Sequence, residues 1–416
     1  MEVPYVDVKK IPEYISNADS ASIFLNSIPL EERINICRHA MKWFKTNSEE
    51  VATEITAQMG KPLSQARREV DTMIDRAETL FKLAPEVLKE DIILIDSHNI
   101  QKIVKDPIGL SLVISPWNYP LLTTVGSLIP SILCGNPVLL KHSIRTPMVG
   151  EHFEEAFNSV GALGVVQHVF LENENVKHLY KIPNVNFVGF TGSVETGKNV
   201  LKEIAKTGRF IHTSFELGGS DAAYVREDAD LDFAVDNIVD GCLYNAGQSC
   251  CAIERVLVHA SVYDQFLDKA AALITKSYKL GDPMKETTNV GPLALPDAPI
   301  VLKEVVDDAV NLGAELLLGG SIVNDEEGKG RFFEPTILKD CRTDMQVFIR
   351  ETFGPLIPVA RVENDDEALN ILNNSEFGLT SAIYTKDYKK ATELSKRVNI
   401  KNDLLIFLRL TQELYL

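Results

Sequence analysis

The feature that most constrains the fold is an alternation of strand-like and helical segments that begins near residue 109. The run GLSLVIS is followed by the turn SPWNYP, a predicted helix from about Pro120 to Cys134, the stop GNP and the apolar run VLLK. Proline suits the first turn of a helix, and glycine suits its end. Strand, helix and strand in this order are typical of a parallel sheet, because a parallel crossover needs a helix-length connection.

This alternation continues along the rest of the chain. The predicted elements that follow are helix 148–160, strand VVQHVFL, helix 174–180, strand VNFVGF, helix 195–206, helix 230–245, strand ERVLVH, helix 261–279, strand SAIYT and a helix from Lys386. Before them, residues 31–82 show helical spacing, and 92–104 predict a two-stranded excursion with a turn at SHN. The pattern predicts an α/β protein with two doubly wound, Rossmann-like domains.

Composition excludes several classes of partner. The formal net charge of −17 argues against nucleic acid and anionic membranes, because phosphate binding needs a basic surface. The N-terminal segment resembles no leader, and the apolar tract from Leu110 to Leu140 is interrupted by prolines and glycines, so no membrane helix is predicted. The six cysteines and eight histidines show neither disulfide-framework nor metal-ligand spacing. We therefore expect a cytoplasmic protein with reduced thiols and no metal.

One glycine-containing turn is a candidate phosphate site. In 187-FVGFTGSVETGKNV-200 a strand leads through Gly192 and Ser193 into a helix, whose first N–H groups and positive dipole end suit a phosphate. The glycines lack the G-x-G-x-x-G spacing, and many such turns use Gly-Ser for geometry alone. Lys141, at the end of VLLK, is either a ligand contact at the carboxyl edge of the sheet or an ordinary solvated lysine.

Four polar residues are candidates for chemistry, each with a plainer alternative. Asn118 either donates its amide to an oxyanion or stabilises its own turn. Glu216, in the apolar strand end SFELGG, is either a general base or a paired structural carboxylate. Cys250 and Cys251, in YNAGQSCCAIER, are either small buried thiols or a nucleophile beside the exposed amides of the GQS turn.

The order and spacing of these motifs resemble the aldehyde dehydrogenase superfamily over nearly the whole chain. The motifs that carry the resemblance are SPWN, KH, GFTGS, ELGG, GQSC and 351-ETFGP-355. Supporting stretches include ITAQMGKP, VGPL, LGAELLLGG, FFEPTIL and EFGLTSAIYT. GQSC preceded at this distance by ELGG is highly specific. Among branches, LLKHS, ELGGSD and NNSEFGL are most similar to bacterial-type succinate-semialdehyde dehydrogenases.

The resemblance implies a catalytic cysteine. In this family the fourth residue of GQ-x-C is the nucleophile, which selects Cys250 and leaves Cys251 as a neighbour. Its thiolate would add to an aldehyde, and the oxyanion would be held by the Asn118 amide and the Cys250 backbone N–H. Hydride transfer to NAD or NADP would leave a thioester. Glu216 would then activate the water that hydrolyses it, which favours release of an acid over transfer to coenzyme A.

The resemblance also implies a cofactor site. Trp117 and Ser193 would lie near the pyrophosphate, Lys141 on the adenosine ribose, and Glu351 on the nicotinamide ribose beside Phe353. The complete set of implied cofactor-binding residues is Trp117, Lys141, Gly192, Ser193, Gly197, Leu217, Glu351 and Phe353.

Three positions bear on selectivity. Many NAD-selective members have a glutamate where this chain has Ile144, so no carboxylate repels a 2′-phosphate and NADP should be accepted or preferred. Succinate-semialdehyde enzymes of the animal type have arginines where this chain has Gly126 and Tyr244. The substrate is therefore either succinate semialdehyde or a broader, apolar range of aldehydes.

The resemblance assigns the domains and also shows one departure. The expected parts are an NAD(P)-binding domain (1–85 and 106–217), an oligomerisation hairpin (86–105), a catalytic domain (218–400) and a divergent tail (401–416). The family's PFGG loop and final strand are absent from this sequence, which ends VNIKNDLLIFLRLTQELYL. Because that strand joins a partner's sheet in the family, the usual homodimer or tetramer is put in question. The alternatives are a catalytically impaired, truncated protein that retains cofactor binding, and a structural role.

Overall fold

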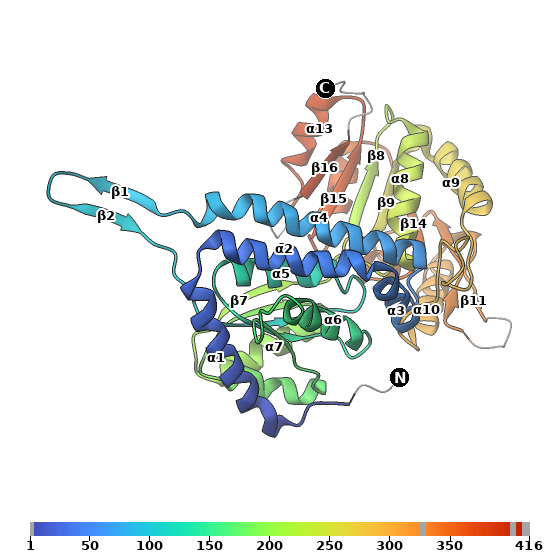
Figure 1. The fold of residues 1–416 in the computed structure, drawn as a ribbon. Helices are drawn as coiled ribbons and strands as arrows, with labels where there is room; N and C mark the ends of the chain where they lie inside the picture. The colour runs from blue at the N-terminus through green and yellow to red at the C-terminus, as the bar shows by residue number, and fades with distance from the viewer. Residues whose placement is uncertain (1–3, 325–329, 400–404, 410–416) are drawn as a thin grey trace. The chain divides into compact units, whose positions relative to one another are not determined.

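The computed structural model describes residues 4–324 and 330–399 and, for the backbone, 405–409 (Figure 1). The chain divides into two compact units. The first comprises Met1–Met59 and Ser64–Leu217, and the second comprises Gly60–Leu63 and Gly218–Leu416. The division between Leu217 and Gly218 falls inside the ELGG motif. The prediction placed residues 60–63 in the first domain, whereas here they belong to the second unit.

The first unit is built on a five-stranded parallel sheet with the strand order β5-β4-β3-β6-β7. Its strands are β3 (Leu110–Ile114), β4 (Val138–Lys141), β5 (Val166–His168), β6 (Val185–Thr191) and β7 (His212–Glu216). The chain winds outward from β3 in one direction to β5 and then returns to continue from β6 to β7. The winding therefore reverses between β3 and β6, as in a doubly wound fold.

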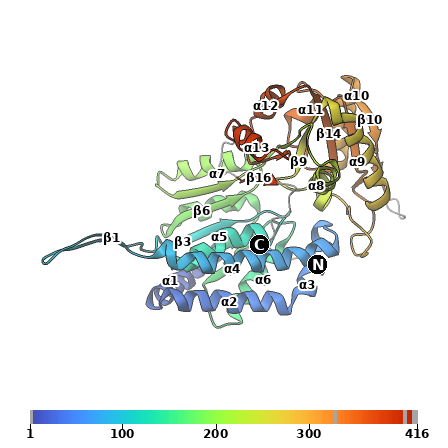
Figure 2. The ribbon, with the colours of Figure 1, turned by 90° about the horizontal axis from the view of Figure 1, so that it is seen from above.

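Helices cover both faces of this sheet. They are α1 (Ile11–Ser27), α2 (Leu30–Thr46), α3 (Ser48–Met59), α4 (Leu63–Leu88), α5 (Leu122–Leu133), α6 (Pro147–Asn158) and α7 (Val194–Lys206), with 3₁₀ helices η1 (Val8–Lys10) and η2 (Asn173–Lys181). Buried Leu112, Leu139 and Val188 pack against residues of α1 and α7. Helices α5 and α6 lie on the opposite face from α7 (Figure 2). The predicted helix at 174–180 is a 3₁₀ helix.

The predicted two-stranded excursion is confirmed as an antiparallel hairpin, β1 (Asp91–Ile95) and β2 (Ile100–Ile103). Its turn is closed by the Asp96 carboxylate, which accepts the backbone N–H groups of His98 and Asn99 at 2.7 Å each. Figure 1 shows the hairpin extending away from the rest of the first unit. Side chains on both of its faces are exposed, including five isoleucines.

The second unit contains a seven-stranded sheet with the order β10-β13-β14-β9-β8-β15-β16, parallel except for the pair β10 and β13. Its strands are β8 (Asp221–Val225), β9 (Ile253–His259), β10 (Glu315–Leu318), β13 (Thr336–Lys339), β14 (Leu356–Val362), β15 (Thr380–Tyr384) and β16 (Leu405–Arg409). A separate two-stranded sheet joins β11 (Ile322–Val323) and β12 (Phe332–Phe333). The predicted tail at 401–416 lies outside the described residues except for the backbone of β16.

Helices also cover both faces of this second sheet. They are α8 (Leu231–Leu243), α9 (Tyr263–Ser277), α10 (Ala298–Asn311), α11 (Gln346–Ile349), α12 (Asp365–Asn373) and α13 (Tyr388–Ser395), with 3₁₀ helices η3 (Tyr244–Gly247) and η4 (Ala260–Val262). Along β8, Ala222 and Tyr224 join the core beneath α10 and α12, while Ala223 and Val225 join the core beneath α8 and α9. Alternate residues of a strand face opposite sides, so a sheet buried on both faces requires a continuous apolar run.

The predicted α/β fold class with two Rossmann-like sheets is confirmed. The predicted helix at 230–245 ends at Leu243, because Asn245 and Ala246 adopt left-handed backbone angles that no right-handed helix accommodates. Within the described part of the chain, no helix is long and apolar enough to cross a membrane.

Candidate active site

In the first unit, most of the predicted residues lie along one edge of the sheet. Because β3, β4, β6 and β7 are parallel, their carboxyl ends share that edge, where Lys141 pairs in register with Ile114 and Glu216 pairs with Thr191. Ligands of doubly wound sheets bind outside the carboxyl ends, where the winding reverses. The predicted residues at this edge are Trp117 and Asn118 after β3, Lys141 ending β4, Gly192 and Ser193 after β6, and Glu216 and Leu217 at the end of β7.

The turn that carries Asn118 is held by two buried side chains. Glu69 of α4 accepts the N–H groups of Leu121 and Leu122 at 2.9 and 3.2 Å, and these belong to the N-terminus of α5, where N–H groups have no partner within the helix. Burial lowers the pKa of His142 to about 4, so its ring is neutral at physiological pH. Its Nδ1 accepts the Ser143 N–H, so Nε2 carries the hydrogen and donates to the carbonyl before Leu121, at 3.1 Å. Asn118 is itself buried.

The glycines near α7 allow close packing. A Cβ atom at Gly192 would lie 2.7 Å from the Phe190 ring, and one at Gly197 would lie 2.6 Å from Leu217. Ser193 is the N-cap of α7, and its hydroxyl accepts the Thr196 N–H at 3.3 Å. The N-terminus of α7 therefore lies at the carboxyl edge of the sheet, where the winding reverses.

Two charged residues end their strands in different surroundings. Lys141 is buried, donates to Asn173 Oδ1 at 2.8 Å, and has its pKa lowered to about 8 by burial. Glu216 was expected in an apolar strand end, and this expectation is wrong because its side chain is exposed. The reason is that β7 is the last strand of the sheet, so its neighbours His212 to Ser214 are exposed as well.

In the second unit, the predicted residues lie at the amino ends of the parallel strands. Cys250 precedes β9, Glu351 and Phe353 precede β14, and Gly219 precedes β8. A Cβ atom at Gly219 would overlap the Cys250 carbonyl oxygen, and Glu351 accepts the Gly219 N–H at 3.1 Å. Segments that are distant in sequence therefore meet around the thiol.

The turn before Cys250 has an unusual backbone. Asn245, Ala246 and Gly247 all have positive φ angles of 55°, 55° and 72°. Such conformations cost about 1–3 kcal/mol each for non-glycine residues and persist only where the surroundings enforce them. Here Gln248 enforces them, because its side chain donates to the Asn245 carbonyl at 3.0 Å and accepts the Ala294 N–H at 2.8 Å.

Cys250 and Cys251 are adjacent thiols that influence each other's pKa. Cys250 is half-buried and Cys251 is exposed. The hydrogen bond from Cys250 lowers the pKa of Cys251 to about 6, and Ser249 Oγ, 3.4 Å from its sulfur, adds to this effect. The same hydrogen bond, with burial, raises the pKa of Cys250. The two thiols therefore titrate as a pair, in which the hydrogen of one thiol stabilises the ionised form of the other.

Sequence reasoning missed two buried carboxylates beside this pair. Asp221 accepts the N–H and the hydroxyl of Thr380 at 2.8 and 2.5 Å, and burial raises its pKa to about 7. Glu254 accepts backbone N–H groups of the ETFGP loop, and burial raises its pKa to about 8. Burial likewise raises the pKa of Glu351 to about 7. An acidic residue at the start of an otherwise apolar strand, as in DAAYV and IERVLVH, was the available signal.

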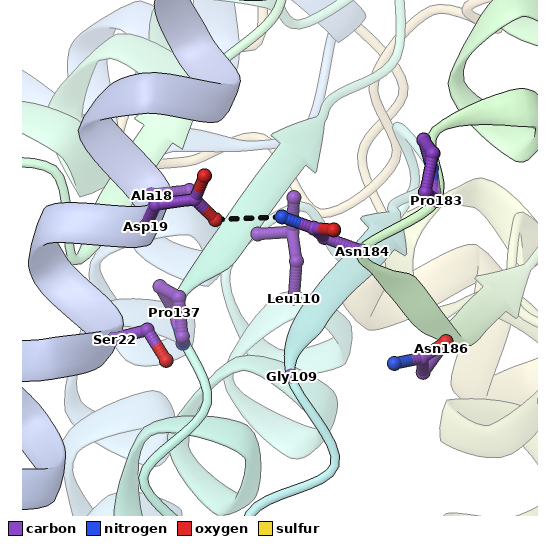
Figure 3. A pocket seen from close by; sticks show the side chains of 9 residues that line it. All are labelled: Ala18, Asp19, Ser22, Gly109, Leu110, Pro137, Pro183, Asn184 and Asn186. Carbon is purple, nitrogen blue, oxygen red and sulfur yellow. Dashed lines mark hydrogen bonds between the residues drawn. The ribbon is translucent and has the colours of Figure 1, made fainter.

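A separate pocket lies at the other edge of the first sheet (Figure 3). It has a volume of about 210 Å³ and is lined by the starts of β3 and β6 and by α1, with Asn184 donating to Asp19 at 2.7 Å. No predicted site residue lines it. Across the described ranges, no cluster of three or more His, Cys, Asp or Glu residues could hold a metal ion.

A sequence model of the aldehyde dehydrogenase family matches residues 1–402. The chain belongs to the aldehyde dehydrogenase family. Among curated members, it is 33% identical over 398 residues to the succinate-semialdehyde dehydrogenase [NADP(+)] of Deinococcus radiodurans, covering 95% of this chain and 82% of that protein. It is also 33% identical to the succinate semialdehyde dehydrogenase [NAD(P)+] Sad of Escherichia coli, covering 89% and 79% of the two chains.

A solved aldehyde dehydrogenase shares the architecture of this family member. The succinic semialdehyde dehydrogenase of Streptococcus pyogenes, solved in complex with NADP+, superposes with a TM-score of 0.90 at 28% identity, covering 98% of this chain and 88% of that one. The likeness extends over both units, so the aldehyde dehydrogenase fold is present throughout the described chain.

Proposed function

We propose that this enzyme oxidises an aldehyde to a carboxylic acid through a thiohemiacetal and a thioester on Cys250. The observation that carries the proposal is the adjacent pair of thiols Cys250 and Cys251, which follows a strained turn and precedes β9 at the amino edge of a sheet. The lowered pKa of Cys251 keeps one negative charge on the pair at neutral pH. Nucleophilic catalysis by a thiol needs such a charge, because the thiolate attacks and the thiol does not.

The first step is addition to the aldehyde. The two thiols share one proton and one negative charge; with the proton on Cys251, the Cys250 sulfur is the thiolate and bonds to the carbonyl carbon. The carbonyl oxygen becomes an oxyanion, for which the Asn118 amide and the Cys250 backbone N–H serve as donors. Rigid support of the Asn118 turn by Glu69 and His142 suits this role, since a preorganised donor does not reorganise during the reaction.

The second step releases the acid. A bound nicotinamide cofactor supplies the acceptor for the hydride whose loss converts the thiohemiacetal to a thioester. Glu216 then removes a proton from water, the hydroxyl bonds to the thioester carbon, and the Cys250 thiolate leaves. The exposure of Glu216 in this structure suits a base that must meet water.

The residues present fit such a cofactor. Trp117, Ser193 and the N-terminus of α7 would hold the pyrophosphate. Lys141 would bind the adenosine ribose, and Glu351 with Phe353 the nicotinamide ribose. The remaining contacts in this proposal are Gly197 and Leu217, which pack against each other.

We propose that NADP is accepted at least as well as NAD. Ile144 is an exposed apolar residue at the position where a carboxylate would repel a 2′-phosphate. The relatives from D. radiodurans and E. coli are named for NADP(+) and NAD(P)+. Comparison of kcat/KM for the two cofactors tests this, and a strict preference for NAD would contradict it.

The proposed substrate is succinate semialdehyde or a similar semialdehyde, as in the names of the relatives. A second candidate, an apolar aliphatic aldehyde, is favoured by Gly126, around whose Cβ position no atom lies within 4 Å. Neither Gly126 nor Tyr244 supplies a cation for a substrate carboxylate. Kinetics with succinate semialdehyde and hexanal separate the two candidates.

We also propose that the β1–β2 hairpin is covered by a second copy of the chain. An isolated two-stranded hairpin is marginally stable in water, and Ile92, Ile93 and Ile95 are each 62% exposed. The mass of the particle in solution tests this. Wild type should be a dimer or a larger oligomer, and Ile93→Lys should shift it toward monomer; a monomeric wild type would contradict the proposal.

The central experiment is NAD(P)H formation by the purified protein with a panel of aldehydes. Cys250→Ala should abolish it, and unchanged activity in that variant would remove the proposed mechanism. Cofactor binding without any turnover would favour the alternative of a catalytically impaired protein.

A further inference from the structure

We infer that Glu254 is a positioning residue that fixes the segment 351–353, and with it the nicotinamide-ribose contacts, to the strand that follows Cys250. This inference rests on the proposed function of Glu351 and Phe353. Glu254 itself touches neither substrate nor cofactor in this scheme. It acts through the backbone of the loop.

The hydrogen bonds of Glu254 are all directed to that loop. The residue lies near the start of β9 and is only 2% exposed. Its two carboxylate oxygens accept the Thr352 N–H at 3.0 and 2.9 Å, and one of them also accepts the Phe353 N–H at 2.8 Å. Above about pH 8, where Glu254 is ionised, these bonds are roughly twice as strong as bonds between neutral partners.

The loop needs this support because its backbone is strained. Phe353 has a φ angle of 51°, a left-handed conformation that costs about 1–3 kcal/mol for a residue with a side chain. Without the two hydrogen bonds, Phe353 would relax to a negative φ and its ring would point elsewhere. Glu351, two residues earlier, would lose its place against Gly219, whose N–H it accepts at 3.1 Å.

A carboxylate buried at this position needs hydrogen-bond donors to offset the cost of its burial. Val256, Leu257 and Val258 of β9 are buried, and burying an ionisable group beside them costs free energy that an isoleucine at this position would avoid. The same loop continues to Gly354, whose carbonyl lies where a Cβ atom at Gly247 would be. Glu254 therefore binds the segment 351–353, which packs through Gly354 against the turn that precedes the thiols.

The test is Glu254→Gln, which keeps the shape and removes the charge. The Kd for NADPH, measured by fluorescence titration at pH 9 where Glu254 is ionised, should rise about tenfold, the effect expected for weakening charge-assisted bonds. The alkylation rate of the thiols without cofactor should stay within about twofold of wild type. Hydrogen exchange at the Thr352 and Phe353 amides should accelerate.

The matched control is Asp365→Asn. Asp365 is a partly buried carboxylate of the same unit that accepts the Tyr224 hydroxyl at 2.9 Å and Arg226 Nε at 2.8 Å. This variant should lower the unfolding midpoint and leave the NADPH Kd unchanged. If Glu254→Gln does not fold, Glu254→Asp replaces it, since the shorter side chain keeps the charge and loses the reach.

Two outcomes would overturn the inference. One is unchanged exchange at Thr352 and Phe353 in the Glu254 variant, and the other is an equal rise in Kd in Asp365→Asn. Hydrogen exchange requires no turnover. A wild-type protein that oxidises no aldehyde would therefore count against the proposed function, while the exchange result still decides the role of Glu254.

Discussion

Removing the Cys251 thiol should suppress the reactivity of Cys250. In wild type the hydrogen bond between the two thiols lowers the pKa of Cys251 to about 6, so the pair is ionised at pH 7.5. In Cys251→Ala, Cys250 loses its partner and keeps the influences that raise its pKa, namely burial and the nearby carboxyls of Asp221 and Glu351. The charge on the site at neutral pH should therefore disappear.

The magnitude follows from the ionised fraction. A thiol with an ordinary pKa of ~8.5 is about one-tenth ionised at pH 7.5, and Cys250 alone should be less ionised than that. Alkylation at pH 7.5 should therefore fall at least about tenfold, because only the thiolate reacts. With rising pH, the rate should increase through about pH 6 in wild type and only above about pH 8.5 in the variant.

The assay is the rate of iodoacetamide modification at Cys250 between pH 5 and 10, located by tandem mass spectrometry within the tryptic peptide 227–255, which contains both thiols. Its third cysteine, Cys242, is buried and should not react. Cys251→Ser is the control, since its hydroxyl can still donate to a Cys250 thiolate and should preserve part of the rate. Identical pH profiles for wild type and Cys251→Ala would refute the coupling of the two thiols.

Three further predictions follow from other parts of the fold. Asn118→Ala should lower kcat by about 10²–10³ by removing an oxyanion donor, and an effect on the aldehyde KM alone would contradict that role. Gly247→Ala should destabilise the second unit severely, because φ is 72° and the new methyl group would overlap the Gly354 carbonyl. The control is Gly161→Ala, where φ is 80° but no atom lies within 4 Å of the new methyl group. Urea unfolding of this control should show only the backbone strain, about 1 kcal/mol. The free energy of unfolding should fall as pH drops below about 6.5. His142 and His168 stay neutral in the folded chain, where their pKa values are about 4 and 3, whereas the same histidines of the unfolded chain take up protons. His168→Gln should flatten that loss, and an unchanged slope of unfolding free energy with pH would show that burial of His168 is not responsible.

Several elements could be predicted from the local sequence pattern alone. The strand VLLK, the turn SPWN and the helix after it were predictable because a strand, a proline-initiated helix and a glycine stop are specified by neighbouring residues. Lys141 was placed at a strand end for the same reason. The hairpin at 91–103 was visible from two short apolar runs and an Asp-Ser-His-Asn turn.

Other features depend on residues far away in the chain. The exposure of Glu216 follows from the edge position of β7, which no local pattern specifies. Asp221 is bound by Thr380 from 159 residues away, and Glu254 is bound by Thr352 from 98 residues away.

The sequence by itself determined the elements, the family and the identity of the candidate nucleophile, because these depend on periodicity and on short motifs. Only the tertiary structure decided the charge of the thiol pair and the supports around it. A pKa depends on burial and on every nearby charge, and both are set when distant strands come together. The proposed roles of Cys251 and Glu254 depend on which distant segments pack around them, and the preferences of single residues do not specify that packing.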